Sequence, residues 1–120
     1  EGPAGKRTCA PDAVQADERI LDAGPETIAL IAPMVTAAKS ILWNGPLGNY
    51  EAGYGDQTEA LAHIVAGASG YAVIGGGDTI AAVESLRVQE SIGFMSTAGG
   101  AMLTFLESGT LPAIEAVVHR

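Results

Sequence analysis

The residues best suited to chemistry in this sequence lie in short glycine-rich segments. In one of them, Gly75-Gly76-Gly77 is followed at once by Asp78 and Thr79. Glycines before a helix let a ligand approach the main chain without meeting a Cβ atom. The start of a helix adds unpaired N–H groups and about half a positive charge, a combination that suits phosphate. Because a carboxylate repels free phosphate, Asp78 indicates phosphate bound together with Mg²⁺.

A simpler alternative is a tight turn in which Asp78 only caps the helix. Two better-known phosphate motifs do not fit this segment. Ile80 stands where a dinucleotide fingerprint needs its third glycine, and no Gly-Lys-Ser/Thr follows as in a P-loop. The functional interpretation is therefore a magnesium-nucleotide site that is built mainly from backbone N–H groups.

Two further segments have a related composition. The run Ser96-Thr97-Ala98-Gly99-Gly100-Ala101 predicts a second phosphate cradle, with helix capping by Ser96 or Thr97 as the alternative. A longer loop runs from Asn44 to Glu51. Glu51 has the chemistry to accept ribose hydroxyl groups, or it is an ordinary solvated surface residue.

Each glycine-rich segment follows a short apolar run and precedes a helical pattern. The runs predict strands at residues 40–43, 71–74 and 92–95, and the patterns predict helices at 25–38, 58–65, 79–86 and 101–106. This alternation predicts an α/β fold, a three-layer, Rossmann-like parallel sheet with helices on both faces, present here as a partial domain. Right-handed crossovers then bring all three loops to the carboxyl edge of the sheet, where ligands bind in such folds.

Residues 1–24 lack a clear period and are interpreted as a connector before a main unit of residues 25–120, with one short strand near residues 19–21. Pro33 predicts a kink or two short helices, and Gly67 and Gly109 stand where helix C-caps belong. We expect Trp43 in the core. We expect His63 and the pair Asp17-Glu18 at the solvated surface.

Charge and composition exclude several classes of protein. The chain has 6 basic and 14 acidic residues, a net charge of −8, which argues against a general nucleic-acid binder. No apolar run approaches the roughly 20 residues of a membrane span. With Cys9 as the only cysteine, no intrachain disulfide is possible and the cytoplasm is the default compartment.

Taken together, the three segments, in this order and closing with Leu111-Pro112, resemble the C-terminal nucleotide-binding domain of the phosphoglycerate kinase family. The resemblance extends from about Leu21 to Val118. It implies reversible phosphoryl transfer between 1,3-bisphosphoglycerate and MgADP, giving 3-phosphoglycerate and MgATP in glycolysis.

The resemblance also implies a role for individual residues. Glu51 would bind the ribose of ADP or ATP, and Asn44 and Pro46 would line the nucleoside side. The phosphates would be held by the segment described first, which comprises Gly75, Gly76, Gly77, Asp78 and Thr79, with Asp78 directed at Mg²⁺. Gly99 and Gly100 would present N–H groups to the transferring phosphoryl group.

In the family, this chain would be about the last third of a two-domain enzyme. The N-terminal domain, which binds 3-phosphoglycerate and supplies the catalytic arginine, would lie outside it, as would the lysines of the nucleotide domain. We therefore expect a fragment that is inactive alone and that self-associates through an exposed sheet edge. The alternative is a stand-alone, non-catalytic nucleotide- or phosphate-binding module.

Overall fold

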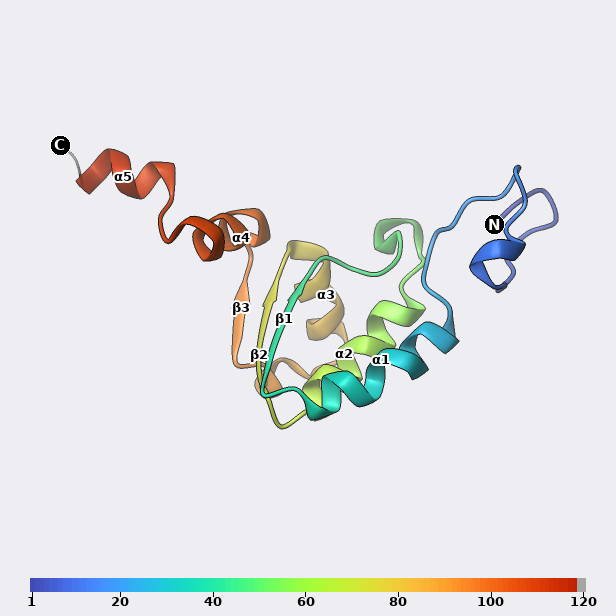
Figure 1. Ribbon diagram of the computed structural model, residues 1–120, viewed down its shortest axis with the longest axis horizontal. Helices are drawn as coiled ribbons and strands as arrows, with labels where there is room; N and C mark the ends of the chain where they lie inside the picture. The colour runs from blue at the N-terminus through green and yellow to red at the C-terminus, as the bar shows by residue number, and fades with distance from the viewer. Residues whose placement is uncertain (119–120) are drawn as a thin grey trace.

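The computed structural model describes residues 1–118, and they form an α/β fold (Figure 1). Its three strands make a parallel sheet in the order β1-β2-β3, and helices follow and precede them. The strands are β1 (Ser40–Asn44), β2 (Tyr71–Gly75) and β3 (Phe94–Ser96). The α-helices are α1 (Pro25–Ala37), α2 (Asp56–Gly67), α3 (Gly77–Ser85), α4 (Gly99–Ser108) and α5 (Pro112–Val118). The predicted Rossmann-like parallel unit is confirmed.

The register of the sheet brings the three strand ends into one row. β1 pairs with β2 over five residue pairs that end at Asn44 and Gly75, and β2 pairs with β3 over three pairs that end at Gly75 and Ser96. Two backbone hydrogen bonds continue this pairing beyond the strands. Gly45 N–H donates to the carbonyl of Gly75 at 3.2 Å, and Gly76 N–H donates to that of Ser96 at 3.1 Å. The loops after the strands therefore start side by side.

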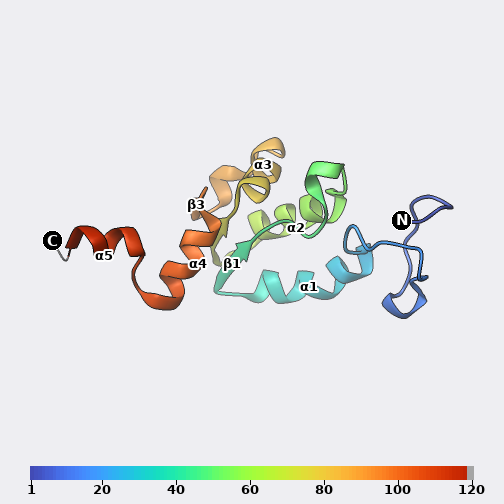
Figure 2. The same cartoon turned by 90° about the horizontal axis from the view of Figure 1, so that it is seen from above.

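The hydrophobic core lies on one face of the sheet. Alternate strand residues, Trp43, Ala72 and Ile74, are buried against α1, α2 and α3, which cover this face (Figure 2). These helices contribute the buried side chains Ile28, Leu61, Ala62, Val65, Ile80, Ala82 and Val83. The period of two in the strands and of three to four in the helices explains why these positions meet. The expected core position of Trp43 is confirmed, and His63 is exposed on α2, as expected.

The opposite face of the sheet is covered only near its carboxyl edge. There Met102 and Gly99 of α4 lie against Gly75, so α4 is the helix of the second face. From that point α4 and α5 project away from the body, while the N-terminal segment extends at the other end (Figures 1 and 2). The radius of gyration is 16.9 Å, against about 14 Å for a compact domain of this length.

The N-terminal segment departs from two predictions. Residues 19–21 form no strand: no neighbouring strand pairs with them, and Arg19 N–H donates to the carbonyl of Glu1 at 2.8 Å. Glu18 is not simply solvated, because Arg7 donates to its two carboxylate oxygens at 2.5 and 2.6 Å and Gln15 N–H donates at 2.8 Å. The hydrogen bonds from Arg7 and Gln15 lower the pKa of Glu18 to about 2. The division between residues 1–24 and 25–120 stays a prediction.

The helices agree with the predictions only in part. α1 runs through Pro33 as one continuous helix, so the alternative of two short helices is wrong. Gly109 caps α4 in the left-handed conformation, as predicted, with φ 72°, whereas Gly67 is the last residue of α2 and Ala68 is its C-cap. Among the described residues, no single helix is long and apolar enough to cross a membrane. α4 and α5 reach that length and composition only together, as a pair bent by 62°.

Candidate functional site

The three predicted loops meet around the side chain of Asn44. A Cβ atom on Gly99 would collide with Asn44 Oδ1 and would lie 2.7 Å from the backbone nitrogen of Gly76. A Cβ atom on Gly75 would lie 2.7 Å from the same Asn44 oxygen and 2.5 Å from Met102 Cε. The close approach of the loops thus depends on glycine at 75 and 99. Gly75 itself is the last residue of β2 and shapes the site by this packing, while its carbonyl accepts from Gly45 N–H.

The N-terminus of α3 is open toward solvent. Its N-cap is Gly76, which has φ 96°, a conformation that L-residues rarely adopt, and no side chain caps the helix. The N–H groups of Gly77, Asp78 and Thr79 have no acceptor within residues 1–118, and a Cβ atom on Gly77 would meet nothing within 4 Å. The capping alternative for Asp78 is therefore wrong. Asp78 is the second residue of the helix, and its side chain is exposed.

Thr79 provides an independent sign that a polar group belongs here. Its side chain is fully buried, at 0% exposure, and its Oγ1 has no hydrogen-bond partner in the described part of the chain. A Cβ atom on Gly76 would lie 3.6 Å from this oxygen, so the hydroxyl lies just behind the helix N-cap. Buried hydroxyl groups are almost always hydrogen-bonded. At 0% exposure, this hydroxyl can meet a bound oxygen-rich group at the N-terminus of α3 only if the loops around it move apart.

The N-terminus of α4 has the same character. Its N-cap is Ala98, without a side-chain hydrogen bond, so capping by Ser96 or Thr97 is wrong. The N–H groups of Gly99, Gly100 and Ala101 also lack an acceptor among the described residues. Around Gly100 nothing lies within 4 Å of an added Cβ. Two helix N-termini thus present six unbonded N–H groups beside each other, an arrangement that favours anions.

The first loop is fixed by contacts that begin inside the fold. Trp43 Nε1 donates to the carbonyl of Gly45 at 2.7 Å, and Leu47 N–H donates at 3.0 Å to the hydroxyl of Thr58, which is itself buried. Pro46 is half-buried in this loop. Glu51 is exposed in the short 3₁₀ helix η2 (Tyr50–Ala52), with its carboxylate free to reach a ligand.

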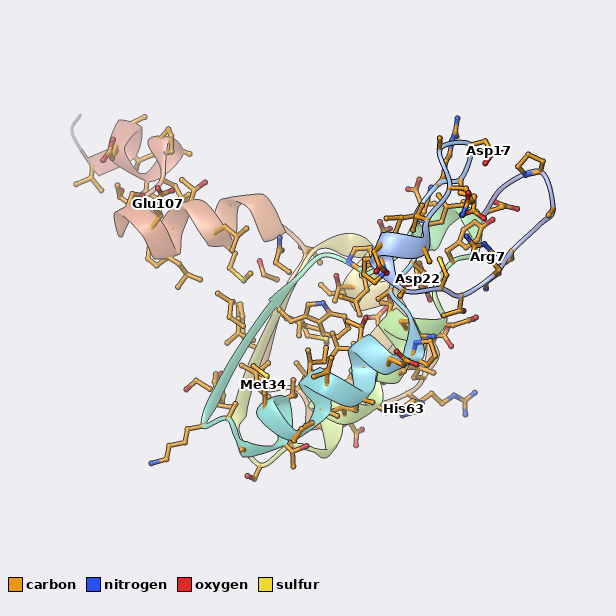
Figure 3. All side chains as sticks on the ribbon, turned by 45° about the vertical axis from the view of Figure 1, so that its right-hand side comes forward. Arg7, Asp17, Asp22, Met34, His63 and Glu107 are labelled. Atoms are coloured by element: carbon orange, nitrogen blue, oxygen red, sulfur yellow. The ribbon has the colours of Figure 1, made fainter. Side chains whose placement is uncertain are left out.

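The sequence alone assigned no role to Asp22. The structure puts Asp22 where the N-terminal segment meets the body of the fold (Figure 3). Its Oδ2 accepts from Gln57 N–H at 3.3 Å, at the start of α2, and its carboxyl group would lie 2.6 Å from a Cβ atom on Gly48. The neighbouring carbonyl of Leu21 accepts from Asn49 N–H at 2.8 Å. The turn thus holds the first loop in place, beside a cavity of about 460 Å³.

The charges near the site are unusual for a phosphate site. In residues 1–118 no group of three or more His, Cys, Asp or Glu side chains could hold a metal ion, so Mg²⁺ would depend on Asp78 together with phosphate oxygens. Lys39 and Arg87 lie toward the amino edge of the sheet, before β1 and after α3. Lys6 is paired with Asp56 at 3.2 Å, and Arg7 with Glu18. Among the described residues, the positive potential at the site thus comes from the backbone N–H groups of two helix N-termini, and these four basic side chains lie away from it.

Comparison with known proteins identifies the family. A family model described as phosphoglycerate kinase matches residues 2–109. Phosphoglycerate kinases from Francisella tularensis subsp. tularensis (strain WY96-3418) and subsp. holarctica (strain OSU18) are 48% identical over 103 residues, 85% of this chain and 26% of each relative. The structure of phosphoglycerate kinase from Coxiella burnetii aligns with a TM-score of 0.75 and 46% identity, over 87% of this chain and 27% of that chain.

The chain therefore spans about a quarter of the length of the relatives it matches. Within that quarter the match includes all three loops of the candidate site. The chain belongs to the phosphoglycerate kinase family.

Proposed function

We propose that this chain forms the nucleotide-phosphate part of a phosphoglycerate kinase, which transfers a phosphoryl group reversibly between 1,3-bisphosphoglycerate and MgADP. The observation that carries the proposal is the meeting of the α3 and α4 N-termini around Asn44, with six N–H groups that have no acceptor among residues 1–118. Family membership supplies the reaction, and this arrangement supplies a place where a phosphate chain fits.

The described residues divide the task among themselves. The N–H groups of Gly77 and Asp78, which are exposed, bind oxygens of the nucleotide phosphates. Thr79 joins them when the loops that bury it move apart, and its Oγ1 then gains the partner that it lacks. The N–H groups of Gly99 and Gly100 bind the phosphoryl group that is transferred. When bound, Mg²⁺ neutralises phosphate charge, and the exposed Asp78 carboxylate is its protein ligand.

The nucleoside belongs to the first loop. Glu51 binds the ribose, and Asn44 and Pro46 line the nucleoside side. Gly75 and Gly76 contribute through their lack of a side chain. A Cβ atom on Gly75 would collide with its neighbours, and Gly76 adopts φ 96° at the helix N-cap. Asp22, Leu21 and Thr58 act indirectly, because they fix this loop against the body of the fold.

The chain alone is expected to have no turnover. Phosphoryl transfer needs positive charge around the equatorial oxygens, where an arginine can contribute roughly 10³–10⁵ in rate. The N-terminus of a helix contributes only about 0.3–1 kcal/mol toward an exposed anion. We propose that the binding of 3-phosphoglycerate and an arginine come from the N-terminal domain of such an enzyme, and that lysines come from the rest of its nucleotide domain.

A chimeric enzyme provides the direct test. Residues 2–109 of this chain would replace the aligned segment of the Francisella kinase, and ATP formation would be followed in a coupled assay. We expect turnover from the chimera and none above background from the chain alone. Asp78→Asn should reduce turnover strongly, whereas His63→Gln, on the exposed side of α2, should not. A folded chimera without activity would contradict the proposal, and turnover by the chain alone would contradict its incompleteness.

A stand-alone, non-catalytic nucleotide- or phosphate-binding module remains the second candidate. It is favoured by the unbonded N–H groups, which need no other part of an enzyme to bind an anion. Titration calorimetry of the chain with MgADP separates the two. Micromolar affinity supports the module, whereas no measurable binding supports an incomplete kinase site.

Two broader expectations accompany this function. Glycolytic chemistry and the single cysteine lead us to propose the cytoplasm as its compartment. Self-association through a strand edge also stays a proposal: β1 and β3 each have one side without a strand partner among the described residues, and such edges invite pairing.

A further inference from the structure

Trp43 connects the hydrophobic core with the first loop. Its side chain is only 7% exposed and belongs to the core cluster, together with Ile74 and Val83. The indole N–H is a donor only, and it usually has a partner when the ring is buried. Here it donates to the carbonyl of Gly45 at 2.7 Å, two residues further along the chain. A core side chain thus holds a backbone group of the loop directly.

The accepting carbonyl belongs to the peptide between Gly45 and Pro46. On the other side of Gly45, the N–H donates to the carbonyl of Gly75 at 3.2 Å. Gly45 has φ 88°, a conformation that L-residues rarely adopt. Because both polar backbone groups of Gly45 are bonded, this residue forms a fixed corner at the end of β1. The direction in which the chain continues to Pro46 therefore depends on Trp43.

The bonds on either side of Pro46 determine where its ring lies. Proline has no N–H to donate, and its ring restricts φ to about −65°. Before Pro46, the Gly45 carbonyl is held by Trp43, and after it, Leu47 N–H donates at 3.0 Å to the buried hydroxyl of Thr58. Without the bond from Trp43, the Gly45–Pro46 peptide can rotate, and only the Leu47 bond then fixes this part of the loop.

We propose that Trp43 is a positioning residue for nucleotide binding, because its indole N–H fixes the Gly45–Pro46 peptide and so the place at which Pro46 meets the nucleoside. This inference rests on the proposed function of the first loop. Trp43 acts through the loop, whereas the phosphates are bound at the N-termini of α3 and α4. Loss of its hydrogen bond therefore weakens nucleotide binding and leaves the transfer step intact. Such a loss raises KM at constant kcat.

A tryptophan analogue separates the hydrogen bond from the packing of the ring. Benzothienylalanine has nearly the shape of tryptophan but carries sulfur in place of the N–H group, and nonsense suppression would introduce it at position 43 of the chimeric enzyme. We expect the KM for MgADP to rise about fivefold, the effect of losing one hydrogen bond. The kcat and the KM for 1,3-bisphosphoglycerate should not change.

Val65→Ala is the matched control for loss of core packing. Val65 lies in the same core cluster and is 1% exposed, and its side chain cannot form a hydrogen bond to the loop. This variant should be less stable than the unaltered enzyme but should keep its KM for MgADP. A KM that is unchanged in the analogue, an equal rise in Val65→Ala, or a matching fall in kcat in the analogue would overturn the inference.

Hydrogen exchange in the chain alone tests the same contact without nucleotide. Trp43 is the only tryptophan, so its indole N–H gives a single NMR signal, which should exchange slowly. With the analogue at position 43, the Leu47 amide should exchange faster and the Gly76 amide should not. A chimera that is inactive with Trp43 intact would contradict the proposed function instead. The exchange data would then decide, since a rapidly exchanging indole N–H or an unaffected Leu47 amide would overturn the inference.

Discussion

Replacing Gly99 with alanine places a methyl group at the point where the three loops meet. The new Cβ atom would collide with Asn44 Oδ1 and lie 2.7 Å from the backbone nitrogen of Gly76 and 3.1 Å from its Cα atom. The Asn44 amide can turn aside, but the backbone of Gly76 cannot, because its N–H is bonded to the carbonyl of Ser96. The methyl group must therefore push α4 away from α3.

The neighbouring Gly100 is a matched control for the size of this effect. A Cβ atom there meets nothing within 4 Å. Both glycines lie in the first turn of α4, so alanine gains the same helical preference at either, about 0.5–1 kcal/mol. This gain cancels in the comparison, and the remaining difference is the cost of overpacking, about 1–3 kcal/mol. Gly100→Ala should be slightly more stable than the original chain, and Gly99→Ala less stable.

Two measurements check this prediction. Urea denaturation followed by Trp43 emission gives the free energy of unfolding of each variant. Hydrogen exchange at the Gly76 amide reports the junction itself, and its protection should fall in Gly99→Ala alone. If both variants were equally stable and Gly76 equally protected, the close approach of the loops in the structure would be wrong.

Two buried threonine hydroxyls and the Arg7–Glu18 ion pair provide further tests of the structure. Thr58→Val removes the acceptor of Leu47 N–H and should lower the free energy of unfolding, measured by urea denaturation, by about 1 kcal/mol. Thr79→Val removes an unpartnered hydroxyl and should leave the free energy of unfolding unchanged or raise it. Equal decreases in the two variants would contradict this. Because the pKa of Glu18 is lowered from 4.5 to about 2, its pair with Arg7 stabilises fully above pH 4.5 and is lost toward pH 2. Thermal midpoints of the unaltered chain and Arg7→Gln should therefore converge as pH falls through this range, and a constant gap would refute the assignment.

The elements that carry the site were predictable because each has a local signal. Apolar runs before Asn44, Gly75 and Ser96 predict the strands, and the right-handed crossover rule then places their loops together. The same rule cannot say how closely the loops approach. The contact of Gly99 with Gly76 depends on how α4 packs on β2, which sequence spacing does not contain.

Two of the failures share one cause, which is dependence on distant partners. Glu18 looked like a solvated acid because its partner Arg7 lies eleven residues away, with no periodic pattern joining them. Asp22 was assigned no role, because its bond to Gln57, 35 residues later, is visible only in the structure. Helix capping by Asp78 and Ser96 failed for a different reason. The N-caps are Gly76 and Ala98, neither of which has a side-chain oxygen that could accept from the first N–H groups of the helix.

The β1–β2 and β2–β3 pairings differ in length, so we expect the two pairings to separate at different stages of local unfolding. β1 and β2 share five residue pairs, but β3 is attached by only three, and the helix that follows it touches little else. Local fluctuations should detach β3 with α4 long before the rest unfolds. The α4 side of the loop junction thus depends on the shorter of the two strand pairings. A phosphate bound by both Gly77 and Gly100 would hold α4 beside α3.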